Sequence, residues 1–180
     1  MLFRSHCSEE FPEVIYVMGN HEYYHGDYKK IPQTIKECLS EYPNIHFLNN
    51  EHVEIGDVMF IGGTLWTDMN KGDEMTLHQI SRLMNDFNIV VNSDRTTYFR
   101  NVDGDIANRT GKFQPEDAVA EHVAMLNVIH ALISADRSMG IKKNVVVVGH
   151  HSPSKRSTKP QYESEYIMNG GYSSDLTDFI

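Results

Sequence analysis

Two apolar runs along the chain each end in a glycine that is followed by polar side chains. The first covers residues 14–18, is rich in β-branched and aromatic positions, and stops at the tetrapeptide Gly-Asn-His-Glu of residues 19–22. The second covers residues 144–148 and stops at Gly-His-His, residues 149–151. Runs of this length and composition predict buried strands. Because chemistry in α/β folds gathers at strand ends, the two endings predict one shared site.

The rest of the hydrophobic pattern predicts helices and strands in alternation. Helical spacing of apolar residues predicts helices over residues 2–10, 31–42, 77–84 and 115–138, and a further helix that begins at Ser174. Short apolar stretches predict a strand over residues 45–48 and a hairpin of residues 52–55 and 58–61. A helix that leads directly into a buried strand, as residues 115–148 do, favours the α/β class.

Residues 67–111 are harder to read. Apart from the short helix, this segment has no clear periodicity, and residues 101–109 form a polar stretch that we expect to be irregular, with a turn at residues 103–105. Long excursions of this kind are typical of lids and other functional insertions. We therefore expect a helical and irregular insertion at about residues 67–111.

Composition and charge limit the size, the partners and the location that the sequence allows. A chain of 180 residues with 40% hydrophobic and 23% charged positions can bury one sizeable core, as one domain or part of one. A net charge of −9 gives no basic footprint for nucleic acid or an anionic membrane. No signal-type or long apolar segment is visible, so no membrane partner is expected. The two cysteines, Cys7 and Cys38, favour a reducing, cytoplasmic location.

The two strand-end motifs resemble those of the calcineurin-like metallophosphoesterases, a superfamily of two-metal phosphatases, phosphodiesterases and nucleases. Residues 19–22 match the third of that family's five motifs, and Gly149-His150 matches the fourth. The family's Asp-x-His, Gly-Asp-x-x-Asp and final Gly-His-x-His motifs have no counterpart in this sequence. The resemblance implies an α/β fold of the αββα sandwich type. Residues 1–180 are then expected to be a partial domain, incomplete at both ends.

Other segments extend the resemblance to a bacterial and phage branch of the superfamily. They are residues 63–68 (Gly-Thr-Leu-Trp-Thr-Asp), 84–87 (Met-Asn-Asp-Phe), 113–117 (Phe-Gln-Pro-Glu-Asp), 150–154 (His-His-Ser-Pro-Ser) and 169–172 (Asn-Gly-Gly-Tyr). They cover nearly the whole chain. The natural substrate does not follow from this pattern.

The resemblance also implies a role for each polar residue at the strand ends. The amide oxygen of Asn20 and the imidazole of His150 are expected to hold a divalent metal, either Mn, Fe, Zn or Mg. His21 is expected beside the scissile phosphate, where it would protonate the leaving oxygen. Glu22 would orient His21 or its loop from behind. His151 is expected to face away from the metals, or to touch substrate from the loop, because adjacent strand residues point in opposite directions.

The function implied is that of a metal-dependent hydrolase of phosphoric esters, in which two metals in the complete domain activate a hydroxide for attack on phosphorus. Its partner would be a phosphate-ester substrate, and the pattern leaves the oligomeric state open. Because the motifs that hold the other metal are missing, a non-catalytic remnant that acts as a binding module stays open as the alternative. Lys155 and Arg156 place two cations near the strand end, and an ordinary solvated loop is favoured over a phosphate-binding one.

Overall fold

Helices and strands alternate along the chain in a computed structural model that describes residues 2–179, with side chains from Ser5 onward. The first part contains α1 (Leu2–Glu10), β1 (Val14–Tyr16), the short 3-10 helix η1 (Asn20–Tyr23), α2 (Ile31–Leu39), β2 (Ile45–Phe47), β3 (Glu51–Ile55) and β4 (Val58–Gly63). The middle part contains α3 (Met69–Gly72), α4 (Glu74–Leu83), α5 (Asp86–Ile89), β5 (Val91–Arg100) and β6 (Ile106–Lys112). The last part contains α6 (Pro115–Ser138), β7 (Asn144–Gly149), η2 (Lys155–Ser157), η3 (Pro160–Tyr162) and α7 (Tyr166–Tyr172). The mixed α/β class expected from the sequence is confirmed.

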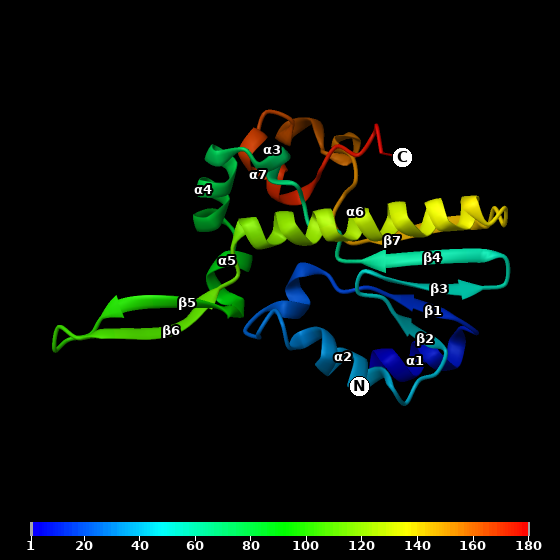
Figure 1. Cartoon of the computed structure of the whole chain (residues 1–180), viewed down its shortest axis with the longest axis horizontal. Coiled ribbons are helices and arrows are strands. Elements are labelled where there is room, and N and C mark those ends of the chain that lie inside the picture. The colour runs from blue at the N-terminus through cyan, green and yellow to red at the C-terminus, as the bar shows by residue number, and fades with distance from the viewer. Residues whose placement is uncertain (1, 180) are drawn as a thin grey trace.

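Two small sheets position the strand ends. β1 pairs in parallel with β2, while β4 pairs antiparallel with β3 and parallel with β7. The two sheets meet at Gly62 of β4, where an added Cβ would lie 2.8 Å from Leu48 and 2.9 Å from Val17. Only glycine leaves room for this approach. In Figure 1, α6 lies along the three-stranded sheet, and α1 and α2 lie beyond β1 and β2 on the opposite side.

The long helix α6 closes one side of the core. Its buried residues Met125 and Ile129 belong to a cluster with Met59 and Ile61 of β4. The predicted helix over residues 115–138 is therefore confirmed, with a proline in its first turn. By length and apolar composition α6 could also cross a membrane, a test that the core helix of a soluble protein passes as well. Of its most apolar stretch, 22% is buried, and Met125 and Ile129 pack against β4 there.

A second, aromatic core supports the loop that follows β1. Trp66 and Phe113 lie with ring centroids 4.9 Å apart, and Tyr28 stacks on Phe113 at 4.5 Å. Tyr23, which ends η1, packs against Trp66 at 5.9 Å and is 1% exposed. Rings of this size bury a large apolar area in a fixed geometry. They anchor η1, and with it the polar residues at its start.

Within the stretch expected to be irregular, residues 106–109 are part of strand β6, so the expectation was wrong for them, while residues 101–105 form the loop between β5 and β6. β5 and β6 form a long antiparallel hairpin that extends away from the body of the molecule (Figure 1). Residues 96–99 (Thr-Thr-Tyr-Phe) have high strand propensity. The predicted turn at residues 103–105 is confirmed, because the Asn101 N–H donates to the Asp105 carbonyl at 2.9 Å and Gly104 has φ = 91°. The predicted helix near residues 77–84 is also confirmed, as α4.

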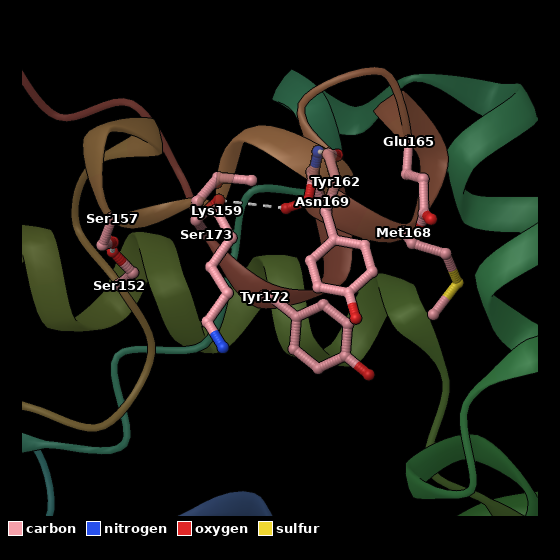
Figure 2. A pocket seen from close by; sticks show the side chains of 10 residues that line it. Ser152, Ser157, Lys159, Tyr162, Glu165, Met168, Asn169, Tyr172 and Ser173 are labelled. Atoms are coloured by element: carbon pink, nitrogen blue, oxygen red, sulfur yellow. Dashed lines mark hydrogen bonds between the residues drawn. The ribbon is translucent and has the colours of Figure 1, made fainter.

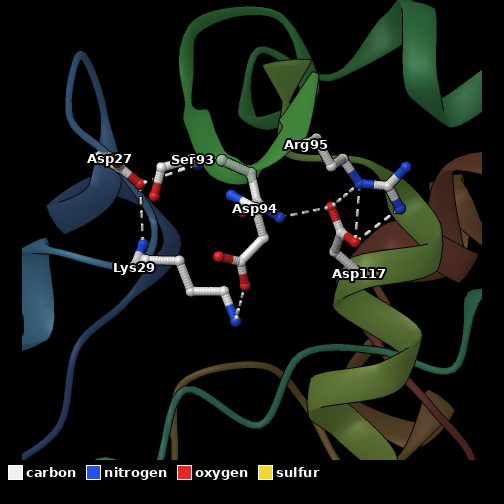
Figure 3. Close-up of polar contacts among 7 residues, drawn as sticks. Asp27, Lys29, Ser93, Asp94, Arg95 and Asp117 are labelled. Atoms are coloured by element: carbon white, nitrogen blue, oxygen red, sulfur yellow. Dashed lines mark hydrogen bonds and ion pairs between the residues drawn. The ribbon is translucent and has the colours of Figure 1, made fainter. Parts of the chain in front are cut away.

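Charged side chains hold the base of this hairpin (Figure 3). Arg95 binds Asp117 of α6 in a bidentate manner, with N–O distances of 2.7 to 3.0 Å. Lys29 pairs with Asp94 at 2.9 Å. Bidentate Arg–carboxylate pairs have a fixed geometry. The hairpin is therefore held at its base from two sides.

Two other expectations were wrong. The strand over residues 144–148 is not fully buried: Val146 and Val147 are 42% and 44% exposed, because among residues 2–179 β7 pairs with β4 alone. No helix begins at Ser174 within residues 174–179, which form an irregular segment and a turn. Ser174 instead makes tertiary contacts: its N–H donates to the Ser152 carbonyl at 3.0 Å, and its Oγ accepts from the Asp68 N–H at 3.0 Å.

Candidate functional site

The two predicted strand ends meet in the fold. Gly149 at the end of β7 lies in register with Gly63 at the end of β4, and the His150 N–H donates to the Thr64 carbonyl at 3.3 Å. The His150 ring then extends over Gly19 to Asn20. Its Nε2 lies 3.0 Å from the Asn20 Oδ1, although 130 positions separate the two residues. The predicted approach of Asn20 and His150 is confirmed.

Asp86 fixes the orientation of the Asn20 amide. The Asn20 Nδ2 donates to the Asp86 Oδ1 at 2.6 Å. Because a carboxylate can only accept hydrogen bonds, the NH₂ group of Asn20 must face Asp86, and its carbonyl oxygen must face His150. Asp86 is 2% exposed. A buried carboxylate therefore directs the oxygen of Asn20 toward the histidine.

Tyr24 satisfies the other oxygen of Asp86. Its hydroxyl donates to the Asp86 Oδ2 at 3.2 Å. Burial, the charge of Asp86 and this hydrogen bond raise the pKa of Tyr24 to about 12, with a smaller contribution from Tyr172. The phenol therefore stays protonated and remains a donor at neutral pH.

His21 and Glu22 belong to the same loop but make different contacts. The exposed His21 ring packs on Tyr24 with centroids 4.3 Å apart, so His21 is connected through Tyr24 to Asp86. Glu22 turns back and accepts a hydrogen bond from the Gly19 N–H at 2.8 Å, which closes the first turn of η1. Glu22 thus holds the loop that carries Asn20 and His21.

His151 is buried beside His150, with the two ring centroids 5.1 Å apart in an edge-to-face arrangement. It is 6% exposed, its ring packs on Trp66 with centroids 5.2 Å apart, and its Nδ1 donates to the Thr64 carbonyl at 3.3 Å. Burial lowers the pKa of His151 to about 4, so the ring is neutral at pH 7. His150, by contrast, is exposed. Of the two adjacent histidines, only His150 faces Asn20.

Lys155 does not lie in a solvated loop, so this expectation was wrong for that residue. Its ammonium donates to the carbonyl oxygens of Ser173 at 2.6 Å and Asn169 at 3.1 Å, and to the Asn70 Oδ1 at 3.3 Å. Burial lowers the pKa of Lys155. The side chain therefore fastens the loop after His151 to α7 and α3. Arg156 is exposed, as expected.

The spacing of Asn20 and His150 suits a shared metal ion. The His150 Nε2 donates a hydrogen bond to the Asn20 Oδ1 at 3.0 Å. Two donors that each lie about 2.1 Å from one ion, at right angles to each other, are also about 3.0 Å apart, so an ion fits between the two atoms once the imidazole proton has left. An amide oxygen with an imidazole nitrogen suits Mn, Fe or Zn. Among residues 2–179, no group of three or more His, Cys, Asp or Glu side chains has the arrangement of a metal site. The candidate site therefore depends on this mixed pair.

Asp86 and Tyr24 are the residues of this arrangement that motif reasoning missed. Asp86 falls within residues 84–87, which had been noticed only for their resemblance to the family. A carboxylate among the apolar side chains of Met84, Phe87 and Ile89 was the signal in the sequence. A charge that must be buried needs partners, so such a position marks a polar network.

Comparison with known proteins finds one similarity. A protein of Acanthamoeba polyphaga mimivirus, named "Uncharacterized protein L509", is 35% identical over 97 residues. The matched segment covers 51% of this chain and 34% of that relative, so it spans about a third of the relative's length. No family model and no solved structure matches the chain.

Proposed function

We propose that this chain is part of a metal-dependent hydrolase of phosphoric esters, with the αββα architecture of the calcineurin-like metallophosphoesterases. One observation carries the proposal: Asp86 turns the Asn20 oxygen toward the His150 Nε2, which lies 3.0 Å away. If Asn20 and His150 were ordinary turn residues that met by chance, there would be no need for the buried Asp86 carboxylate to set the direction of the Asn20 amide. The contact also joins the two segments that match the family motifs.

In this proposal Asn20 and His150 hold one divalent ion, with Mn the first to test. The ion supplies Lewis acidity toward a phosphoryl oxygen and lowers the pKa of water. Asp86 keeps the Asn20 oxygen directed at the ion. Outer partners of this kind typically change metal affinity by about 10- to 100-fold.

His21 is the acid that protonates the leaving oxygen. Its ring is exposed and packs on Tyr24, so it is reachable by a substrate while its position is restricted. Tyr24 is in turn held by Asp86. Asp86 therefore positions both the metal-binding pair and, through Tyr24, the acid. A reaction at a single phosphorus atom requires such groups to be held in a fixed relative position.

Hydrolysis of an aryl phosphodiester with Mn²⁺ tests the proposal. The assay uses this chain and the longest polypeptide that its reading frame encodes. Each is measured as the wild type and with His21→Ala and with His150→Ala. His78→Ala, which changes an exposed histidine of α4, is the matched control. A general acid contributes about 10²- to 10⁴-fold, so His21→Ala should lower kcat by that factor in the active protein.

With only one pair of ligands identified, the 180-residue chain alone should turn over no faster than its own His21→Ala, His150→Ala double variant. Robust turnover by the short chain that a chelator abolishes would show that residues 1–180 contain metal ligands besides Asn20 and His150. An inactive longest polypeptide would overturn the hydrolase proposal in favour of a binding module.

A further inference from the structure

A cavity of about 560 Å³ opens beside the candidate site. Its wall includes Ser152, which lies two positions after His150, and Tyr172, the last residue of α7. The Ser152 N–H donates to the Tyr172 carbonyl at 3.2 Å, so the backbone joins this wall directly to the loop that carries His150. The cavity wall is therefore joined to His150 through residues 150–152.

Two tyrosines and a lysine border the cavity. Tyr162 and Tyr172 are 44% and 56% exposed, so both rings are accessible to a ligand in the cavity. Figure 2 shows the two hydroxyls pointing the same way, with the Lys159 ammonium on the other side of Tyr172. Met168 adds a polarisable apolar surface, and Glu165 lies at the edge. The lining thus combines flat rings with one cation.

This chemistry selects among phosphate esters. The rings and the thioether of Met168 favour a flat aromatic group, because stacking on tyrosine needs a π-face. Lys159 favours an anion, and the carboxylate of Glu165 can accept hydrogen bonds from an exocyclic amine. A polynucleotide is disfavoured, because the net charge of −9 gives no attraction for a polyanion.

We propose that this cavity binds the base of a nucleotide, which makes a nucleotide the substrate class of the neighbouring site. The assignment to substrate depends on the proposed hydrolase function, whereas the binding of the base does not. Tyr162 and Tyr172 stack on the base, Lys159 neutralises part of the phosphate charge, and the ester oxygen faces the His150 side of the cavity.

Binding is measured by calorimetry on this chain, without metal, with adenosine monophosphate and with ribose 5-phosphate as probes. The variants are Tyr172→Leu and Tyr162→Leu, which keep an apolar side chain but remove the ring. Tyr98→Leu is the matched control, because Tyr98 is 69% exposed on the hairpin and does not line the cavity. Adenosine monophosphate should bind at least about 10-fold more tightly than ribose 5-phosphate, and each ring removal should cost about 10-fold. Tyr98→Leu should bind like the wild type.

Equal affinity for the two probes, or an equal loss in the control variant, would overturn the proposal. A second arm compares kcat/KM for a nucleotide ester and an alkyl ester in the longest polypeptide of the reading frame. Base binding without any hydrolysis would refute the hydrolase while the base-binding cavity stands. Hydrolysis without preference for the nucleotide would refute the cavity's role while the hydrolase stands.

Discussion

Replacing Gly19 by alanine separates the geometry of the site from the stability of the fold. Gly19 has φ = −88° and ψ = −178°, an extended conformation that alanine adopts without strain. The glycine is needed for space, because an added Cβ would lie 2.7 Å from the Cε1 of His150 and 2.9 Å from both ring nitrogens. The closest contact is about 0.7 Å shorter than ordinary van der Waals contact. The ring must therefore move off Asn20.

The exposed His150 ring can swing into solvent, so this change should cost little stability. We expect a loss within about 1 kcal/mol, at the low end of overpacking effects, and hence a fall in Tm of no more than about 4 °C. Affinity for Mn²⁺ should fall at least about 10-fold, because the ring nitrogen leaves the Asn20 oxygen. Calorimetric titration with Mn²⁺ and thermal unfolding measure the two effects on the same samples.

Gly140→Ala is the matched control. Gly140 has φ = 73° and no atom within 4 Å of an added Cβ, so alanine there strains the backbone and touches nothing. It should lower stability by about 1 kcal/mol and leave the metal affinity unchanged. Wild-type affinity in Gly19→Ala would refute the idea that the ring position matters. A Tm lower by 8 °C or more would refute the idea that the ring moves freely.

Three further predictions concern the supports of the site. Asp86→Asn should lower the affinity for Mn²⁺ by about 10- to 100-fold in calorimetry, because an asparagine can donate to Asn20 and no longer fixes its amide; unchanged affinity would contradict this role. Burial lowers the pKa of His122, whose Nδ1 donates to the Trp66 carbonyl, so its contribution to stability is present above about pH 6.5 and is lost as pH falls below it. In urea unfolding, the free energy of unfolding should decline from pH 7.5 to 5. The slope of this decline should correspond to about one proton fewer in His122→Gln than in the wild type, and equal slopes would be the contrary result. Arg95→Ala should lower the free energy of unfolding by about 1 kcal/mol and should increase hydrogen exchange in the hairpin but not in α6. Hydrogen exchange at the wild-type rate would show that the ion pair with Asp117 does not hold the hairpin.

The sequence predicted the meeting of the strand ends because local signals are strong there. Apolar runs that end in glycine define strands and their polar exits, and the His150 ring at one exit lies against Gly19 at the other. The sequence did not predict the direction of the Asn20 amide. That direction depends on Asp86, 66 positions away, and no local pattern describes a contact across such a separation.

The hairpin of β5 and β6 was missed for a similar reason. Its strands carry polar side chains on both faces because most of the hairpin lies in solvent, so the alternation that marks a half-buried strand is absent. The role of Lys155 was also missed. A lysine beside an arginine in a serine-rich stretch is typical of a solvated loop, and only the folded chain shows three oxygens around its ammonium.

Pulsed electron paramagnetic resonance of bound Mn²⁺ tests the central claim most directly, because it detects nitrogen coordinated to the ion. The account predicts nitrogen coupling from one histidine in the wild type and in His21→Ala, and its loss in His150→Ala. Coupling that persists in His150→Ala, or Mn²⁺ bound with no nitrogen coupling in the wild type, would contradict a metal held by Asn20 and His150.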